Sequence, residues 1–141
     1  MLATHLLDTL PSVMNEWRKV MSEGLPDGLS VNQYRVLYFV HAGQCSQAFL
    51  AKYLGVTPAA MSKMVDALVD KKMLDRKANT QDRRHTHLVI TPAGKRIVHQ
   101  MRLQVEKRMQ IHLDALSQNQ QKEIERALLL LQSVFSVTGE K

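Results

Sequence analysis

The chain has 141 residues, 45% of them hydrophobic, and a formal net charge of +6. This length fits one compact domain that buries a sizeable core. The single cysteine, Cys45, excludes an internal disulfide and a thiolate cage for zinc, as expected in a reducing compartment. No apolar run approaches the ~20 residues needed to cross a bilayer, and the N-terminus lacks a signal-peptide pattern, so we expect a cytoplasmic protein without membrane contact.

The positive charge is concentrated in the middle of the chain. Residues 57–108 hold twelve Lys and Arg residues against five Asp and Glu residues, which leaves a net charge of −1 on the rest. Such an excess suits a polyanionic partner such as nucleic acid. A solvated basic face would explain the charge equally well, so the partner has to be argued from motifs.

The first part of the chain predicts three helices. Apolar residues at helical spacing indicate a helix over 2–22, followed by a loop that contains Gly and Pro. Ser30 and Gln33 have the Ser-x-x-Gln spacing of a capping box and predict a second helix. Ser46 predicts the N-cap of a short third helix over 47–54, because Ser is a favoured capping residue and a glycine follows the segment.

The third helix and the next one are close enough to form a helix-turn-helix. Thr57 followed by Pro58 predicts the start of a fourth helix, which we expect to run to about Lys72. A short helix, a tight turn containing Gly55 and a second helix are typical of this motif. Apolar residues at helical spacing should face the core on the fourth helix: Met61, Met64, Val65 and Leu68.

The outward start of the fourth helix suits a close approach to DNA. Its side chains are short, and the backbone N–H groups at a helix N-terminus can bind a phosphate. Ser and Lys side chains can donate to base acceptors, and Ala can contact a thymine methyl group. A helical hairpin that only packs is the alternative interpretation. The residues that we predict to contact the major groove are Thr57, Pro58, Ala59, Ala60, Ser62 and Lys63.

Two strand-like runs, 74–77 and 86–90, enclose a polar and basic segment and predict a hairpin. A thin arm that carries arginine suits the minor groove, where narrow A·T-rich stretches concentrate negative potential. An aspartate beside the arginines can hold one of them in position through a charge-assisted hydrogen bond. The alternative is an exposed hairpin with a weak surface ion pair. The residues that we predict to contact DNA from this hairpin are Lys77, Asp82, Arg83 and Arg84.

Two long helices should complete the chain. Thr91 and Pro92 predict the start of a fifth helix, which runs to about Leu116, and Ser117 predicts the start of a sixth. The sixth helix is apolar on almost all faces, including the leucines of 128–131, so it must be covered on most faces. The first and sixth helices carry more apolar surface than the helix-turn-helix can cover, which predicts a two-fold homodimer.

The segment from Asp82 to Gly94 resembles the wing of the MarR family of bacterial regulators. The family pattern is Asp-x-Arg, three residues, then Leu-x-Leu/Ile-Thr-x-x-Gly, and it is matched at Asp82, Arg84, Leu88, Ile90, Thr91 and Gly94. Residues 54–63 resemble the start of the family's recognition helix, and the six-helix pattern and the length also agree. The resemblance implies a mainly α fold, a winged helix-turn-helix with a helical dimerisation region. Its elements follow the order helix, helix, strand, helix, helix, strand, strand, helix, helix.

The resemblance also implies how the chain is divided. One MarR-type domain would cover 1–141, with the winged helix-turn-helix at 30–90 and dimerisation helices at 1–22 and 92–138. A dimer would set two recognition helices ~34–36 Å apart, so the double-stranded DNA operator should be a pseudo-palindrome.

The resemblance implies groove contacts as well. The fourth helix would enter the major groove, and Arg84, held by Asp82, would reach the minor groove. Lys72 departs from the family pattern, because glycine is common at that position, so the turn after the fourth helix is in doubt.

A pocket for a small effector between the dimerisation helices and the winged part is implied by the same resemblance. Aromatic side chains with an arginine suit an aromatic or anionic ligand. Ordinary core packing is the alternative for each of these residues. The candidates are Met14, Trp17, Arg18, Tyr34, Tyr38 and His41.

Catalytic and metal-binding functions find little support. The sequence lacks a Gly-rich phosphate loop, a Gly-x-Ser-x-Gly motif and a His-Glu-x-x-His motif, so we expect neither an enzyme nor a cofactor. His85 and His87 would point the same way on a strand, yet no carboxylate cluster accompanies them, and we expect no metal. Cys45 lies close to a helix N-terminus, where a thiol pKa can fall, so an oxidation switch is a minor alternative.

Three functions remain open from the sequence. The leading hypothesis is a dimeric repressor that leaves its operator when a ligand binds. An activator would use the same DNA chemistry. A module that binds another protein through the winged part is the third, and the basic excess argues against it.

Overall fold

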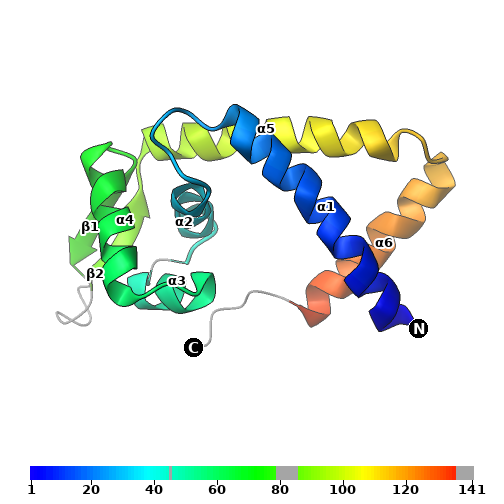
Figure 1. Cartoon of the computed structure of the whole chain (residues 1–141), viewed down its shortest axis with the longest axis horizontal. Coiled ribbons are helices and arrows are strands. Elements are labelled where there is room, and N and C mark those ends of the chain that lie inside the picture. The colour runs from blue at the N-terminus through cyan, green and yellow to red at the C-terminus, as the bar shows by residue number, and fades with distance from the viewer. Residues whose placement is uncertain (45, 79–85, 136–141) are drawn as a thin grey trace.

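The structure, a computed structural model, describes residues 1–44, 46–78 and 86–135. A lobe of three helices and a hairpin forms one end of the molecule, and three long helices form an open frame at the other (Figure 1). The helix α5 belongs to both, because its first turns pack on the lobe and the rest extends away from it. The elements are α1 (Leu2–Gly24), α2 (Val31–His41), α3 (Gln47–Leu54), α4 (Pro58–Asp70), β1 (Leu74–Ala78), β2 (Thr86–Ile90), α5 (Pro92–Leu113) and α6 (Gln118–Val134).

Five helices begin at the capping residues that the sequence predicts. In α2, the Ser30 hydroxyl accepts from the backbone N–H of Gln33 at 3.1 Å, and the Gln33 side chain accepts from the N–H of Ser30 at 2.9 Å. This reciprocal capping box satisfies two N–H groups that a helix start otherwise leaves unpaired. The remaining four helices have a side-chain cap from a Ser or Thr hydroxyl in the same place: Ser46, Thr57, Thr91 and Ser117.

Three helix ends differ from the sequence-based expectation. The first helix continues to Gly24, two residues beyond the predicted end, whereas α4 stops at Asp70 and α5 at Leu113. In α4 the reason is a Schellman turn, in which the N–H of Met73 bonds to the carbonyl of Leu68.

The Schellman turn after α4 keeps the geometry that glycine usually provides. The N–H of Lys72 bonds to the carbonyl of Val69, and Lys72 has a φ of 60°. The same pair of bonds closes α3, where Gly55 has a φ of 68°. The lysine that departs from the family pattern therefore accepts a left-handed conformation, which costs a residue with a Cβ roughly 1–2 kcal/mol.

The core lies inside the lobe and at the adjoining ends of α1 and α5. The predicted inward face of α4 is confirmed, since Met61, Val65 and Leu68 are fully buried and Met64 packs half-buried against the core. Ala51 is also buried, and its small side chain lies on α3, which packs against α4. Burial of each large apolar side chain stabilises the fold by roughly 1.5–3 kcal/mol. The lobe therefore has a packed core within one copy of the chain.

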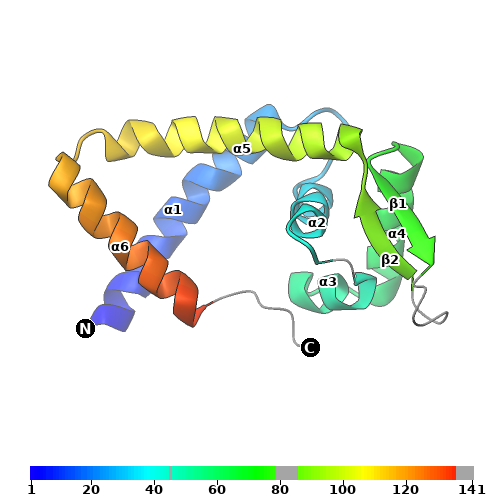
Figure 2. The same ribbon diagram turned by 180° about the vertical axis from the view of Figure 1, so that it is seen from behind.

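The wing hairpin is antiparallel and packs beside α4 (Figure 2). Its register pairs Leu74 with Ile90 and Arg76 with Leu88, and Leu74 and Leu88 point into the core. The strand implied between the second and third helices is absent from the described residues, and a single bridge from Ser46 to His87 takes its place.

The start of α5 is held tightly against the turn after α4. The hydroxyl of Thr91 donates to the carbonyl of Lys72 at 2.6 Å and accepts from the N–H of Gly94 at 3.1 Å. A Cβ on Gly94 would lie 2.3 Å from the carbonyl oxygen of Met73, which no side chain can accommodate without a shift. The Thr-x-x-Gly pattern is therefore a backbone contact that sets where the long helix leaves the lobe.

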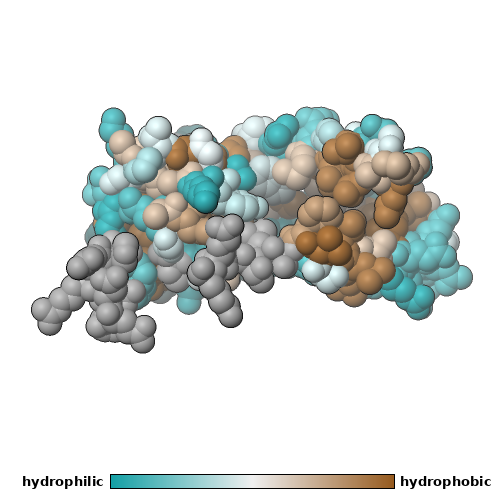
Figure 3. Space-filling view, turned by 90° about the horizontal axis from the view of Figure 1, so that it is seen from below, coloured by the Kyte–Doolittle hydropathy of each residue, from teal (hydrophilic) through white to brown (hydrophobic). Residues whose placement is uncertain are grey.

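The frame is largely uncovered. Helix α1 packs along α5, but none of the 17 residues of α6 is buried. The exposed fraction is 71% for Leu130 and 74% for Val134, and Figure 3 shows apolar side chains gathered over this end of the molecule. Within the described part of the chain, every helix is too short or too polar to span a bilayer.

Candidate nucleic-acid interface

The N-terminal turn of α4 is open to solvent. The hydroxyl of Thr57 accepts from the N–H of Ala60 at 3.1 Å, and Pro58 occupies the first helical position, where no backbone N–H is needed. The structure brings all six predicted major-groove residues onto this open start of the helix. Thr57, Pro58, Ala59 and Lys63 are exposed, and Ala60 and Ser62 are half-buried.

The wing contributes one described candidate. Lys77 is exposed on β1, paired in register with His87 of β2. The predicted minor-groove residues Asp82, Arg83 and Arg84 lie outside the described residues, as do His85 and Cys45.

An ion pair that sequence reasoning missed joins the wing to α4. Nη1 of Arg76 donates to Oδ1 of Asp66 at 2.5 Å, and Nη2 donates to the carbonyl oxygen of Ser62 at 3.5 Å. No sequence signal pointed to this contact, because a strand residue and a helix residue ten positions apart meet only through the turn between them.

The candidate effector residues are partly brought together. The rings of Trp17 and Tyr34 have centroids 6.5 Å apart, and so do those of Tyr34 and Tyr38. Tyr34 is buried, whereas Tyr38 is 41% exposed. The other candidates, Met14, Arg18 and His41, have exposed side chains.

Arg102 of α5 is the second residue that sequence reasoning missed. Burial raises the pKa of Tyr34, Tyr38 adds to the rise, and the positive charge of Arg102 opposes it. Glu106, which accepts a hydrogen bond from Nε of Arg102 at 2.8 Å, raises the pKa of Arg102, and both tyrosines contribute. A cation therefore lies near two phenol groups, which is a feature that an anionic ligand needs.

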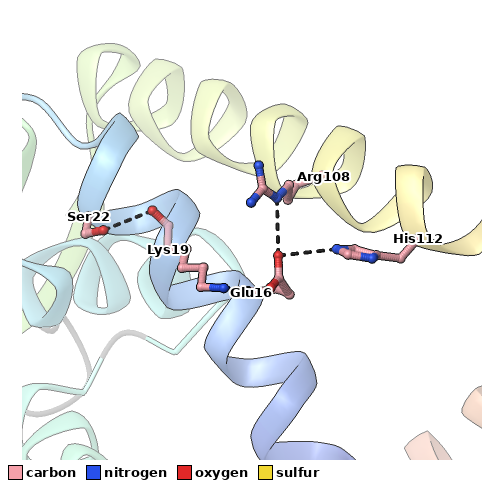
Figure 4. Close-up of polar contacts among 5 residues, drawn as sticks. All are labelled: Glu16, Lys19, Ser22, Arg108 and His112. Carbon is pink, nitrogen blue, oxygen red and sulfur yellow. Dashed lines mark hydrogen bonds and ion pairs between the residues drawn. The ribbon is translucent and has the colours of Figure 1, made fainter.

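A second charged cluster ties α1 to α5 (Figure 4). Glu16 accepts from Nε of Arg108 at 3.2 Å and lies 3.3 Å from Nε2 of His112, and Lys19 donates to its other oxygen at 3.1 Å. The hydrogen bonds from Lys19, Arg108 and His112, in that order, lower the pKa of Glu16 to about 2. The carboxylate thus stays charged through the range in which an ordinary glutamate takes up a proton.

A cleft of about 730 Å³ lies between α5 and α6, apart from the aromatic candidates. Glutamines and apolar residues form most of it. Its walls are Gln110, Leu113, Gln118, Gln121, Lys122, Ile124, Glu125, Leu128, Leu129 and Gln132. In the described ranges, His, Cys, Asp and Glu side chains form no group of three or more that could hold a metal ion.

Helix α3, the glycine turn, α4 and the β1–β2 hairpin together form a winged helix-turn-helix, an arrangement that is typical of DNA-binding proteins. A sequence model of the MarR family matches residues 27–85, which cover most of this unit. Over these residues the chain is similar to the MarR family. The matched family and the solved structures of similar fold are those of transcriptional regulators, which are not enzymes.

Known proteins resemble the chain beyond the matched segment. The HTH-type transcriptional regulator YhbI of Bacillus subtilis is 26% identical over 105 residues, 73% of this chain and 68% of that protein. A mutant of MarR from E. coli has a TM-score of 0.74 and 22% identity, with coverage of 93% and 96% of the two chains.

A mutant of S. aureus MepR bound to an oligodeoxyribonucleotide has a TM-score of 0.62 and 18% identity, with coverage of 96% and 99%. Together with the MarR structure it shows that the six-helix fold, with its two-stranded wing, extends over nearly the whole chain.

Proposed function

We propose that the chain is a homodimeric, ligand-responsive repressor that binds a pseudo-palindromic operator in double-stranded DNA. The observation that carries the proposal is the exposed start of α4, with its short side chains, beside a hairpin in the basic part of the chain. A regulator of this kind works where the DNA lies, which supports the cytoplasm as its compartment.

In this proposal the DNA contacts are those predicted from the sequence. The start of α4 enters the major groove, where backbone N–H groups at the N-terminus of the helix face phosphate and Ser62 and Lys63 face base edges. Lys77 contacts the backbone beside the groove, and the wing residues Asp82, Arg83 and Arg84 act in the minor groove. The MepR structure with an oligodeoxyribonucleotide supports DNA binding for a protein of the same fold.

The frame provides the proposed dimer interface. The winged part is 30–90, and the dimerisation helices are 1–22 and 92–138, whose last residues lie outside the described ranges. Exposed apolar side chains on α1 and α6 support this division, because a two-fold axis can cover such faces with their own copies. The dimer would then place two recognition helices ~34–36 Å apart on one face of the duplex.

The proposed effector is a small aromatic or anionic molecule. The supporting observation is the row of Trp17, Tyr34 and Tyr38 with Arg102 beside it, at the junction of α1, α2 and α5. Met14, Arg18 and His41 would complete its surroundings. A ligand there shifts DNA binding only if it binds more tightly to dimers with the wrong spacing between their recognition helices.

The test uses purified full-length protein and a duplex from upstream of its own gene. We expect a dimer by light scattering and duplex binding by fluorescence anisotropy that weakens steeply with salt. Loss of the gene should raise transcription from that upstream region if the protein is a repressor. A monomer, or a protein that ignores every duplex in dilute buffer, would contradict the proposal.

A further inference from the structure

The ion pair between the wing and α4 lies on the surface that the proposed function gives to DNA. Arg76 of β1 bonds to Asp66 and to the backbone of Ser62, which is itself a predicted major-groove residue. Ser62 and Asp66 are four residues apart, so they lie on successive turns of one face of α4. The guanidinium therefore lies along the edge of the recognition helix.

Asp66 is a negative charge in a region where DNA needs positive ones. Its side chain is 57% exposed, one turn beyond the predicted contact residues. At physiological salt, charges interact over about 8 Å, so a carboxylate at the edge of α4 acts on any phosphate that docks within that range. Like charges brought together at an interface are costly, so an unpaired Asp66 would oppose binding.

Folding stability does not account for the pair. Arg76 is 31% exposed and Asp66 more so, and an exposed ion pair typically contributes about 0–1 kcal/mol. The packed core beneath, with Met61, Val65 and Leu68 fully buried, holds α4 in place without it. The larger consequence of the contact is electrostatic. The guanidinium of Arg76 cancels the negative charge of Asp66, and while it is paired it cannot bind phosphate itself.

We propose that Arg76 is a positioning residue that neutralises Asp66 and thereby sets the affinity of α4 for the phosphate backbone. The inference rests on the proposed DNA-binding function. Removal of Arg76 exposes the carboxylate to phosphate, whereas removal of the Asp66 charge releases a guanidinium that can bind phosphate itself. The two single changes thus act on DNA affinity in opposite directions.

The experiment compares wild type, Arg76→Gln, Asp66→Asn and the double variant. Duplex affinity is measured by fluorescence anisotropy over a series of salt concentrations, on the upstream duplex and on an unrelated one. We expect Arg76→Gln to weaken binding about tenfold and Asp66→Asn to tighten it several-fold. Asp66→Asn should steepen the slope of log affinity against log salt by about one, because one more phosphate is neutralised. The double variant should bind like wild type.

Two controls separate this effect from general charge and from unfolding. Asp70→Asn makes the same charge change one turn along α4, away from the ion pair with Arg76, so it should leave affinity within about twofold. Thermal midpoints should stay near that of wild type for all variants, since surface changes are usually worth less than 0.5 kcal/mol.

Several results would overturn the inference. If Asp66→Asn weakens binding on both duplexes, the pair is only a structural brace between wing and helix. If it weakens binding on the upstream duplex alone, Asp66 reads a base. Single variants that both bind like wild type would also exclude the proposal, while DNA binding by wild type would leave the proposed function standing. A wild type that binds no duplex would refute both.

Discussion

The lobe and the frame use apolar residues in opposite ways. In the lobe, α4 directs Met61, Val65 and Leu68 inward and they are fully buried by neighbours in the same chain. In the frame, α6 buries none of its residues, although it is rich in leucine. The lobe therefore buries its apolar residues within one chain, whereas the described residues leave the apolar side chains of α6 uncovered.

The largest effect is expected in the lobe core. Leu68→Ala leaves a cavity beneath α4 and should cost about 2–5 kcal/mol of the free energy of unfolding, measured by urea denaturation. Lys63→Ala, exposed on the same helix, is the control and should stay within about 0.5 kcal/mol. Equal losses in the two variants would mean that α4 is not anchored by this face.

Substitutions on the exposed apolar face of α6 should change the dimer dissociation constant rather than the packing of the core. Leu130→Asp places a charge in the proposed dimer interface and should raise the dimer dissociation constant at least a hundredfold, read by light scattering across protein concentrations. Lys122→Asp, also on α6, is the comparison for added negative charge. A dimer that survives Leu130→Asp unchanged would show that α6 is covered in some other way.

The two Schellman turns permit a smaller test within the lobe. Lys72→Gly should stabilise the protein by about 1 kcal/mol, because glycine adopts a φ of 60° without the Cβ penalty. Gly55→Ala, in the equivalent turn after α3, should destabilise it by a similar amount. Urea denaturation of both variants checks the pair, and a destabilised Lys72→Gly would indicate that the lysine side chain outweighs the backbone strain.

The smallest effect concerns the joint between α1 and α5. The folded state lowers the pKa of Glu16 from 4.5 to about 2. The ionised carboxylate of Glu16 therefore stabilises the fold above pH 4.5, and this contribution is lost as the pH falls toward 2. Glu16→Gln should therefore flatten the dependence of unfolding free energy on pH in that window.

Glu23→Gln, on the same helix, is the control for the loss of a carboxylate. Urea denaturation at both ends of the window measures the change. If Glu16→Gln and wild type lose stability in parallel on acidification, the cluster does not contribute as described.

Local features of the fold could be predicted from the sequence. The caps at Ser30, Ser46, Thr57, Thr91 and Ser117 depend on hydrogen bonds that span three residues, so the pattern of side chains suffices. The helical spacing of apolar residues likewise predicted the buried side of α4. Of the strand expected before α3, the described residues show one bridge, from Ser46 to His87, and this contact depends on the distant hairpin and not on local spacing.

The candidate sites show the same division. The exposed start of α4 follows from its own turn of helix, and the predicted residues lie there. Sequence spacing did not indicate three partners that come from other elements. Arg76 pairs with Asp66, Arg102 lies near Tyr34, and Arg108 pairs with Glu16. Ionic contacts of this kind arise only after helices and strands have packed.

By itself, the sequence determined the helices, their caps, the helix-turn-helix and the apolar excess of the last helix, because each depends on neighbours within a turn or two. The tertiary structure alone decided which charges meet, that Lys72 adopts a left-handed conformation, and that Gly94 lies against the backbone of Met73. Those features require segments from different elements to come within a few ångströms, a distance that only packing sets.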